Sequence, residues 1–579
     1  MKELAQNWVS AFERALTASD RSELRDLFAP DSHWRDNGAL TWDFRQHSGR
    51  DTVIDQLVST AGHTRPHHWR ISERWPAPAL RDAVEPPSIE AFFDFETERA
   101  SAVGLLRAYE DPSSPVGIRA HALYTRIEEL TGIEAAVDTH ADGEPEVLVV
   151  GAGQAGLMLS AHFRRLGVDF VIADTHERVG DNWRHRYESL KLHNPIGMNG
   201  FPFLQFPQHY PEYLPKDMVG DWLELYASHL GIDVSTSTTF VGAAYDPSAR
   251  RWQATMRSGD GREYDLRPAH IVLATGGTGG RPRIPTLPGL PDFNGSVCHS
   301  SQYERAQKWN AETAIVVGTG SSGHDVALDL HNHGVQVTIL QRGPAVVNAI
   351  DTANSAYPDY FVPDIPTDLV DIRYGVELIN PLREKSSREF QDRAKVVDKE
   401  LHDGLTEAGM RLGDGVEGRG FLDLFLRTGG GYYFNTGASD AIVDGSIQVA
   451  QSADLDSFTS RGARMRNGNV IAADLVVLAT GYENRRTEVE HWFGSEVAER
   501  VGDVARLDAG GEWANIWSQT PQPGLWFNAG GINQVRPGSK ILALLIKADL
   551  DGAIPPALRR AEIPAPAAHL TSSGATSHT

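Results

Sequence analysis

The chain has 579 residues, of which 41% are hydrophobic, and its formal net charge is −23 at pH 7. This length allows about three or four domains, and the acidic balance argues against nucleic acid as a partner, because phosphates require a basic surface. The single cysteine, Cys298, excludes intramolecular disulfides and the paired redox cysteines of a disulfide reductase. Since the sequence shows neither a leader nor an apolar span of membrane length, we expect a cytoplasmic protein that does not enter membranes.

The amino-terminal residues, 1–140, are expected to form a separate unit. Apolar residues recur at helical spacing from Leu4 to Leu16, and later apolar runs such as Ala120 to Tyr124 indicate strands. This arrangement resembles the α+β cone of the nuclear-transport-factor-like, SnoaL-like proteins, some of which bind small molecules while others only dimerise. His33 to Asp36 could line a pocket in such a cone. The alternative, which we favour, places Trp34 in the core and its charged neighbours in solvent.

A glycine-rich turn, Gly151-Ala-Gly-Gln-Ala-Gly156, stands between an apolar run, Val147 to Val150, and an amphipathic stretch, Leu157 to Leu166. A second apolar run ends at Asp174, about 20 residues beyond the first glycine, which is the spacing expected for a carboxylate that reaches an adenosine ribose. The glycines let the backbone approach a pyrophosphate, and the following helix offers unpaired N–H groups. This unit predicts an FAD site with contacts from Gly151, Gly153, Gln154, Ala155, Gly156 and Asp174.

The same unit returns as Gly318-Thr-Gly-Ser-Ser-Gly323, again flanked by an apolar strand, a helix and a second strand. Here the second strand ends in Gln341 and Arg342 rather than in an acid. An acid would repel a phosphate, whereas an arginine at this spacing suits the 2′-phosphate of NADP(H). The second unit therefore predicts an NADPH site with contacts from Gly318, Gly320, Ser321, Ser322, Gly323, Gln341 and Arg342.

These units indicate an α/β fold class with two Rossmann-like dinucleotide-binding domains, for FAD and NADPH, preceded by the α+β cone. The polar segment Asp138 to Pro145 marks the first boundary. Ile271 to Leu273 and Leu475 to Leu478 are expected to be strands that return to the sheets. Glu384 to Asp403 is expected to be a charged helix in an insertion that covers the active site. The expected divisions are 1–140 for the cone, 141–308 and 431–556 for the two parts of the FAD-binding domain, 309–430 for the NADPH-binding domain with its helical insertion, and 557–579 for a flexible tail.

Taken in order, the motifs resemble those of the class B flavoprotein monooxygenases, and within them the flavin-containing monooxygenases and the plant indole-pyruvate (YUCCA-type) enzymes. The resemblance extends from about residue 146 to about residue 552, and the ordered series is more specific than any single motif. The residues that carry it are Gly151–Gly156, Gly180-Asp-Asn-Trp183-Arg-x-Arg-Tyr187-x-x-Leu190-Lys-Leu-His193-x-Pro195, Phe293-x-Gly295-x-x-x-His299-x-x-x-Tyr303, Gly318–Gly323 and Ala479-Thr-Gly-Tyr482.

The resemblance implies how the two cofactors are used. NADPH reduces the flavin by hydride transfer, NADP⁺ stays bound, and oxygen adds to give a C4a-(hydro)peroxyflavin, which delivers one oxygen atom to a small organic substrate. The motif made of Phe293, Gly295, His299 and Tyr303 links the two nucleotide domains and positions them. We therefore interpret His299 as structural and gating rather than catalytic.

Other residues take roles from the same resemblance. Asn533 and Gln534 precede a helix expected to start near Ser539, and they are the candidates beside the flavin edge, where N–H groups can stabilise negative charge on the reduced ring. Trp183 either packs against FAD or is buried without touching the cofactor. His193 replaces the flavin-side asparagine of animal flavin-containing monooxygenases, and it is either a flavin-side donor or a satisfied structural histidine.

The substrate is only partly indicated. Baeyer–Villiger relatives place Trp and then Pro or Asp at the end of the linking motif, whereas this chain has Tyr303 and Glu304, which favours oxidation at nitrogen or sulfur. Baeyer–Villiger or decarboxylating chemistry on a carbonyl compound is the alternative. A second alternative is an NADPH oxidase, or a non-catalytic flavoprotein whose cone binds a ligand or dimerises. No metal is expected, because His67 and His68 lack companions at ligand spacing, and a homodimer is left open.

Overall fold

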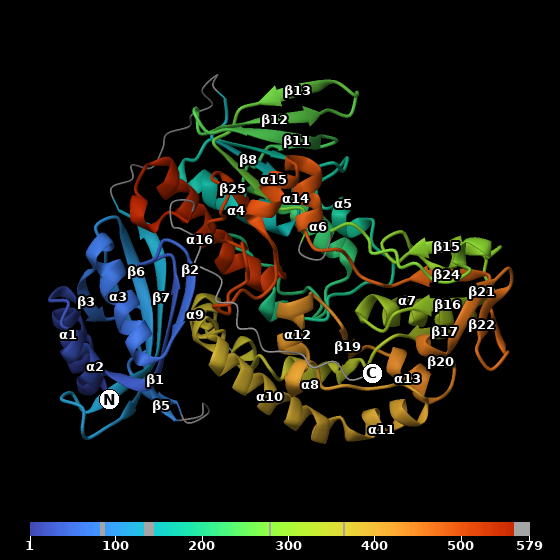
Figure 1. Cartoon of the computed structure of the whole chain (residues 1–579), viewed down its shortest axis with the longest axis horizontal. Coiled ribbons are helices and arrows are strands. Elements are labelled where there is room, and N and C mark those ends of the chain that lie inside the picture. The colour runs from blue at the N-terminus through green and yellow to red at the C-terminus, as the bar shows by residue number, and fades with distance from the viewer. Residues whose placement is uncertain (82–86, 132–143, 277–279, 363–364, 561–579) are drawn as a thin grey trace, which may run out of the picture.

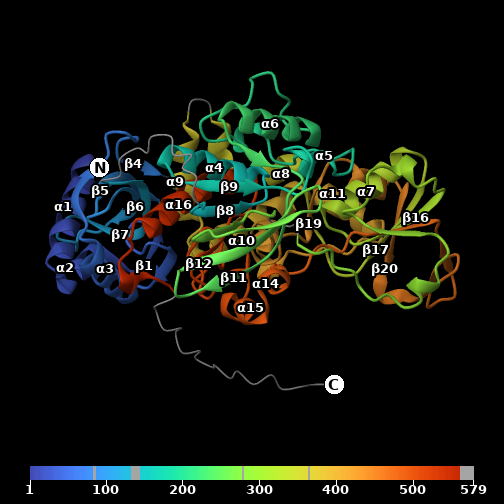
Figure 2. The ribbon, with the colours of Figure 1, turned by 90° about the horizontal axis from the view of Figure 1, so that it is seen from above.

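The computed structural model describes residues 1–81, 87–131, 144–276, 280–362 and 365–560. The expected boundary at residue 140, most of the segment Asp138 to Pro145, and the expected tail from residue 561 onward lie outside the described residues. Figure 1 shows three main sheets side by side, with the amino-terminal sheet at one end, and Figure 2 shows the same order from above. No described helix combines the length and the apolar character needed to cross a bilayer.

The amino-terminal sheet carries helices on one face. Trp8 and Phe12 of the first helix, α1, pack against Phe93, Leu106 and Leu123 of the sheet, which confirms the helix expected from Leu4 to Leu16. The likeness to a SnoaL-like cone stays a prediction. The strand order is β2-β1-β7-β6-β5-β3, with β4 paired to β5. The elements are α1 (Lys2–Thr17), α2 (Arg21–Leu27), β1 (Phe28–Asn37), β2 (Phe44–Ser48), α3 (Arg50–Thr64), β3 (His67–Ile71), β4 (Ala79–Arg81), β5 (Ser88–Glu96), β6 (Ala100–Glu110) and β7 (Ile118–Leu130).

The central sheet is parallel and follows the order β10-β9-β8-β14-β25. Val147 and Val149 of its middle strand pack on the helices α4 and α16, while Leu148 and Val150 pack toward a small antiparallel sheet. Burial on both faces explains why its strands read as continuous apolar runs. The elements are β8 (Val147–Val150), α4 (Gln154–Leu166), β9 (Phe170–Ala173), α5 (Asp181–Arg184), α6 (Lys216–His229), β10 (Val234–Ser235), β11 (Thr239–Asp246), β12 (Arg251–Arg257), β13 (Glu263–Leu266), β14 (His270–Leu273), β25 (Leu525–Phe527) and α16 (Ile532–Leu550).

The third sheet is also parallel, with the order β15-β24-β16-β17-β20. In the sequence, its first strand, β15, begins at Ser296 and its last strand, β24, ends at Leu478. Three of its five strands, β15, β20 and β24, therefore lie outside residues 309–430. We propose that the second nucleotide domain has these wider limits. The elements are β15 (Ser296–His299), β16 (Thr313–Val317), α7 (Ser321–Asn332), β17 (Gln336–Gln341), α13 (Ala438–Val443), β20 (Ile447–Gln451), β21 (Leu455–Thr459), β22 (Gly462–Met465), β23 (Val470–Ala472) and β24 (Leu475–Leu478).

A helical segment runs along one side of the molecule between the sheets (Figure 1). The helix expected over Glu384 to Asp403 is confirmed as helical but divides at Asp398, whose carboxylate accepts hydrogen bonds from Thr352 Oγ1 at 2.6 Å and from the Ala349 N–H at 3.0 Å. The elements of this segment are β18 (Val346–Ala349), α8 (Ile350–Asn354), α9 (Thr367–Glu377), α10 (Asn380–Val397), α11 (Lys399–Glu407), α12 (Gly420–Thr428) and β19 (Tyr432–Asn435). The helices α14 (Arg486–Phe493) and α15 (Ser495–Val501) pack with β11 of the small antiparallel sheet.

Candidate functional site

The first glycine turn packs tightly against the end of β14. Gly151 has a φ of +101°, and a Cβ built on it would lie 2.7 Å from the carbonyl oxygen of Ala274. A Cβ on Gly156 would lie 1.9 Å from the carbonyl oxygen of Gly151. Only glycine permits both contacts. Gly153 is less confined, because its Cβ would meet the Asn182 amide nitrogen at 3.0 Å.

The second turn repeats this packing with one difference. A Cβ on Gly318 would lie 2.3 Å from the Ala479 carbonyl oxygen, and one on Gly323 would lie 2.2 Å from the Gly318 carbonyl oxygen. Around Gly320, by contrast, no heavy atom of the described residues comes within 4 Å of the Cβ position. The outer glycines are needed for packing within the protein, whereas Gly320 leaves room for a ligand to approach the backbone.

The helices after both turns begin without a side-chain cap. Gly153 and Gly320 are the N-cap residues of α4 and α7, and neither first turn contains an acidic residue. Both helices start at the carboxyl edge of a parallel sheet, so their first N–H groups and positive dipole ends are available to an anion. This arrangement fits the pyrophosphate of a dinucleotide at each turn. Ser321 at the start of α7 donates to the Tyr432 carbonyl oxygen at 3.1 Å, and Ser322 beside it is half-buried.

Asp174 lies at the end of β9, next to the first turn. Its carboxylate accepts hydrogen bonds from the Ala152 N–H at 2.7 Å and the His176 N–H at 2.9 Å, and it also contacts the His176 ring. Burial alone would raise the pKa of Asp174, but the hydrogen bonds from His176 and Ala152 outweigh it and lower the pKa. Asp174 therefore holds the glycine turn in place as a carboxylate, and its contact with a ribose stays a prediction.

Trp183 lies across the entrance of α4. Its indole N–H donates to Gln154 Oε1 at 3.1 Å, and the side chain is half-buried. The carbonyl oxygen of Ala155 accepts a hydrogen bond from Asn528 Nδ2 at 2.8 Å, and the same amide donates to Ser539 of α16 at 2.9 Å. The sequence does not mark Asn528 as a site residue, because a lone asparagine after a short strand belongs to no recognisable motif. It ties the start of α4 to α16.

Gln341 and Arg342 differ in their availability to a ligand. Gln341 is fully buried, donates to the carbonyl oxygens of Gly343 and Arg411, and accepts from the Arg411 N–H at 2.8 Å. Arg342 is exposed, and no described residue forms a hydrogen bond or an ion pair with its guanidinium. Arg411, also exposed, donates to the Arg342 carbonyl oxygen at 2.8 Å. Two arginines thus lie at this strand end, and we propose Arg411, which sequence spacing did not reveal, as a second cation for a 2′-phosphate.

The linking motif is built into the third sheet. Buried His299 ends β15, accepts a hydrogen bond from the Ser301 N–H at Nδ1, and approaches the Gly481 carbonyl oxygen with Nε2 at 3.1 Å. Burial lowers the pKa of His299. Tyr303 is buried and donates to Asp329 of α7 at 2.5 Å, Phe293 packs on Phe458, and a Cβ on Gly295 would lie 2.4 Å from the Asp474 carbonyl oxygen. These contacts are structural, and the gating role of the motif stays a prediction.

His193 lies among aromatic rings. Its ring meets Phe434 edge to face with 4.9 Å between centroids and Tyr432 with 6.4 Å. Burial lowers the pKa of His193 to about 4, so the imidazole is neutral at pH 7. No described side chain satisfies it with a hydrogen bond, which leaves both alternatives for its role open.

The helix α16 begins at Ile532, so the start expected near Ser539 is wrong by two turns. Gln534 Oε1 accepts from the Gly531 N–H at 3.0 Å and caps the first turn, and Pro537 lies within the helix, where sequence reasoning expects a helix to begin or break. Asn533 is half-buried in that first turn. One turn later, Arg536 forms a buried bidentate pair with Asp371 of α9, at 2.7 and 2.9 Å.

A further buried cation lies near the first turn. Arg485 is 3% exposed and donates to Thr275 Oγ1 at 3.2 Å through Nη2, while its Nε and Nη1 have no hydrogen-bond partner within the described chain. Its nearest carboxylate, on Glu488, lies 4.0 Å away. We propose that these donors face the adenine or phosphate side of the first site, because Thr275 follows Ala274, which packs on Gly151. No motif marks Arg485 in the sequence.

The amino-terminal unit has two groups of candidate site residues, residues 33–36 and the pair of His67 and His68, and their environments differ. The expectation that Arg35 lies in solvent is wrong. Arg35 is buried and pairs with Glu512 at 2.5 and 2.9 Å. Asp36 is also buried, and it accepts hydrogen bonds from Thr41 and Thr125. Trp34 lies in the core as expected, and His33 contacts Ser48 at 3.0 Å. These four residues are occupied by protein contacts.

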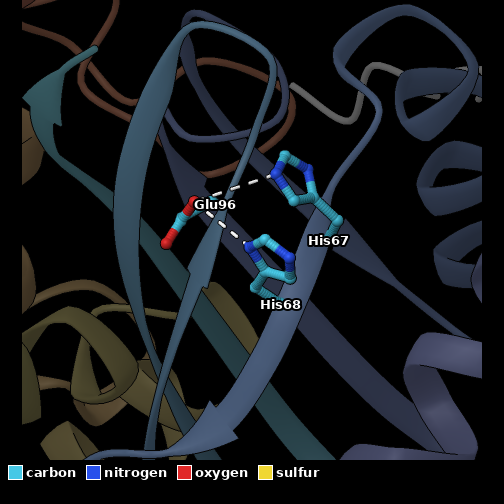
Figure 3. Close-up of side chains that lie close together, drawn as sticks. All are labelled: His67, His68 and Glu96. Atoms are coloured by element: carbon cyan, nitrogen blue, oxygen red, sulfur yellow. Dashed lines mark hydrogen bonds and ion pairs between the residues drawn. The ribbon is translucent and has the colours of Figure 1, made fainter.

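His67 and His68 do have a companion, Glu96 on the neighbouring strand (Figure 3). Glu96 Oε2 lies 3.3 Å from His68 Nδ1 and 3.8 Å from His67 Nε2. The sequence could not show this, because strand pairing of β3 with β5 brings the carboxylate to the histidines. Their three donor atoms lie within 4.8 Å of one another and could hold a metal ion.

Comparisons with known proteins agree with this geometry. The family model described as pyridine nucleotide-disulphide oxidoreductase matches residues 145–359, which include both glycine turns, although the chain has only one cysteine. Indole-3-pyruvate monooxygenase YUCCA1 of Oryza sativa subsp. japonica is 29% identical over 68% of this chain and 86% of its own length. The probable indole-3-pyruvate monooxygenase YUCCA9 of Arabidopsis thaliana is 28% identical over 60% of this chain and 76% of its own length.

Solved structures support the fold. A structure of OTEMO in complex with FAD and NADP is similar with a TM-score of 0.51 and 15% identity, over 71% of this chain and 86% of that one. The two glycine turns, their uncapped helices, the cation at the second strand end and these relatives together identify the fold and the cofactors. The matched family model and the plant relatives support a likeness to the class B flavoprotein monooxygenases, with FAD and NADP(H) as cofactors.

Proposed function

We propose that this enzyme inserts one oxygen atom from O₂ into a small organic substrate at nitrogen or sulfur. The binding of two dinucleotides rests on the two open, uncapped helix starts at Gly153 and Gly320, and the oxygenation rests on the likeness to the plant monooxygenases. The choice of nitrogen or sulfur rests on Tyr303 and Glu304, at positions where Baeyer–Villiger relatives have other residues. Tyr303 contacts Asp329 rather than a substrate site, so it supports the choice only through the resemblance.

We assign separate roles to the cofactors and to the residues around them. FAD and NADPH supply hydride transfer and oxygen activation. The turn at Gly151 and the start of α4 would hold the FAD pyrophosphate, the turn at Gly318 and the start of α7 would hold that of NADPH, and Arg342 with Arg411 would bind the 2′-phosphate. If the first turn of α16 is the flavin edge, that turn would orient the flavin ring and help to exclude water, and the neutral His193 would do so if it is the flavin-side donor.

A carbonyl substrate is the second candidate, and the relatives favour it. The matched plant enzymes are named for indole-3-pyruvate, which is a 2-oxo acid. Oxygenation at or beside a carbonyl group would lead to an ester or to loss of the carboxylate, in contrast to an N-oxide or a sulfoxide.

The test measures NADPH consumption, hydrogen peroxide and oxygenated product in the same assay, with a tertiary amine, a sulfide, a ketone and an aromatic 2-oxo acid. We expect an N-oxide or a sulfoxide in near-stoichiometric amounts with NADPH. Predominant ester or decarboxylated product would transfer the assignment to the second candidate. Peroxide equal to NADPH with every substrate would contradict monooxygenation and support an oxidase.

A further inference from the structure

The amino-terminal sheet is buried on both faces. Leu106 and Leu123 point to α1 and its neighbours, whereas Leu105 and Tyr124, adjacent in sequence, belong to a second cluster on the opposite face. The second cluster is completed by Leu369, Ile372 and Val376 of α9, more than 200 residues away in the chain. The face of the sheet that carries none of the unit's own helices is thus filled by the monooxygenase part of the same chain.

Close approach of α9 to this sheet depends on a glycine. A Cβ built on Gly375 would lie 2.4 Å from the Tyr124 ring, and the Gly375 carbonyl oxygen accepts a hydrogen bond from Arg35 Nη1 at 3.1 Å. Tyr124 is itself 2% exposed and its hydroxyl accepts a hydrogen bond from Asn37 at 3.0 Å. The ring therefore has little freedom to move away from a larger residue on α9.

Ion pairs join the same two parts of the chain. Arg35 and Glu512 form a bidentate pair with side chains only 6% and 8% exposed. Arg373 of α9 pairs with Glu90 at 2.9 Å, and Glu377 pairs with Arg107 at 2.8 Å. Buried charges persist only when they are paired, so separation of the two parts would leave several of these groups unpaired.

The helix α9 connects this sheet with α16. Asp371 lies on α9, among the residues that pack on the sheet, and holds Arg536 of α16 through two hydrogen bonds. Arg536 also donates to the carbonyl oxygens of Met198 at 2.8 Å and Gly200 at 3.1 Å. It is one turn beyond Asn533 in the same helix. The pair of Asp371 with Arg536 therefore joins α9 to α16 one turn from Asn533.

The sheet also contacts α16 directly. Lys540 Nζ pairs with Glu128 of β7 at 2.9 Å, and a Cβ on Gly38 would meet the side chains of Ile127, Leu545 and Ile541 within 3.2 to 3.5 Å. Trp42 and Ile127 belong to the same hydrophobic core as α4 and α16. Figures 1 and 2 both place α9 and α16 beside the amino-terminal sheet.

We propose that residues 1–130 are a positioning element for the flavin site: through α9, Asp371 and Arg536 they fix the first turn of α16, which carries Asn533 and Gln534. This role rests on the proposed function only in taking that turn as the flavin edge. It differs from a module that pairs with another copy through an open sheet face, because α9 covers that face. Gly375, Asp371, Arg536 and Lys540 are positioning residues, not catalytic ones.

The first experiment compares Gly375→Ala with Gly62→Ala in the full chain. Gly62 is a helical glycine of the amino-terminal unit with nothing within 4 Å of its Cβ position, so it controls for the change of helix propensity. In Gly375→Ala we expect hydrogen exchange in residues 532–539 to rise by about tenfold, and the FAD dissociation constant, measured by flavin fluorescence, to rise by about tenfold. Gly62→Ala should change neither quantity.

A second pair of variants tests the proposal independently, in case Gly375→Ala does not fold. Lys540→Gln removes the pair with Glu128, whereas Lys547→Gln removes only a pair with Asp551 four residues away in the same helix. We expect a roughly threefold rise in exchange over residues 532–539 for Lys540→Gln alone. Unchanged exchange and FAD affinity in both Gly375→Ala and Lys540→Gln would overturn the proposal. Both quantities are measured without turnover, so failure of the monooxygenase assignment would leave this test intact.

A different observation carries a second inference, at the edge of the same sheet. Adjacent residues of a strand normally point to opposite faces, yet the rings of His67 and His68 lie 4.5 Å apart, because His68 has a φ of +58° at a break in strand register. His67 Nδ1 lies 3.0 Å from the Arg65 carbonyl oxygen. That bond places the proton on Nδ1 and leaves Nε2 free to bind a metal, as in many histidine sites.

We propose that His67, His68 and Glu96 bind a divalent transition-metal ion such as Zn²⁺, since two imidazoles and a carboxylate suit it. Calorimetry with Zn²⁺ alone should show one site in the full chain that His68→Ala weakens by at least about tenfold. His63→Ala, which removes an exposed histidine of the neighbouring helix, should leave that site unchanged. Equal zinc binding by wild type and His68→Ala would show only adventitious binding and overturn this proposal.

Discussion

Each of the two nucleotide sites is built from a strand, a glycine turn, a helix and a second strand. The residue after that second strand is largely buried and hydrogen-bonded in the first site but exposed in the second. Asp174 is largely buried and holds the backbone of its own turn, whereas Arg342 is exposed and has no protein partner within the described chain. We propose that the first site, which is completed by protein contacts, holds a resident cofactor. We propose that the second, with its unpaired cation, takes a ligand that binds and dissociates.

The largest effect is expected from Gly156→Ala. Its Cβ would stand 1.9 Å from the Gly151 carbonyl oxygen, so the turn cannot keep its shape, and we expect loss of FAD binding together with a lower melting temperature. Gly320→Ala meets no described atom within 4 Å, so it should fold, retain FAD and lose NADPH affinity. Flavin content and NADPH-driven flavin reduction measure both variants. Equal behaviour of the two variants would contradict the different packing of Gly156 and Gly320.

Arg342→Ala should weaken NADPH binding and leave NADH nearly unaffected, because only NADPH carries the 2′-phosphate. Loss of charge-assisted hydrogen bonds worth about 1.5–3 kcal/mol corresponds to about 10- to 100-fold in apparent affinity. Arg411→Ala should change the same preference in the same direction. Steady-state titrations with both nucleotides provide the measurement, and equal losses for NADPH and NADH would show that Arg342 acts elsewhere.

Asp174→Asn should have a smaller effect, with an acidic pH dependence. The pKa of Asp174 is lowered in the folded protein, burial being outweighed by hydrogen bonds from His176 and Ala152. The carboxylate therefore stabilises the fold above its unfolded pKa, and this contribution is lost as the pH falls through the folded value. Thermal unfolding of wild type and variant should converge at acidic pH. A difference that grows as the pH falls would contradict this assignment.

The smallest effect is expected for the pH profile of His193→Asn. Burial lowers the pKa of His193 from 6.5 to about 4, so the ring is neutral from pH 6 to 9 and cannot impose a titration there. Protonation in the unfolded chain should reduce stability only as the pH falls from about 6.5 to about 4. The profile of kcat from pH 6 to 9 should keep its shape in the variant, and loss of a limb near neutral pH would show that His193 is charged in the working enzyme.

Sequence reasoning succeeded where chemistry is local. The glycine turns, their strands and the helix after the first turn could be predicted because backbone approach to a phosphate needs a fixed spacing. That helix is expected from Leu157 to Leu166 and extends from Gln154 to Leu166. It failed where partners are distant. From the sequence alone Arg35 is expected in solvent, because its partner Glu512 is far away in the chain. Glu96 lies beside His67 only because their strands pair. The start of α16 is misplaced from the sequence because Pro537 lies inside the helix, whose first turn is capped by the Gln534 side chain.

One measurement tests the central claim, that a resident FAD and an exchanging NADPH occupy these two different sites. The purified protein is denatured to identify its flavin, and the native protein is mixed with NADPH or NADH without oxygen while flavin reduction is followed. We expect one non-covalent FAD per chain and reduction by NADPH at lower concentrations than by NADH, with that preference lost in Arg342→Ala. Recovery of FMN alone, or equal reduction by both nucleotides in the wild type, would contradict the account.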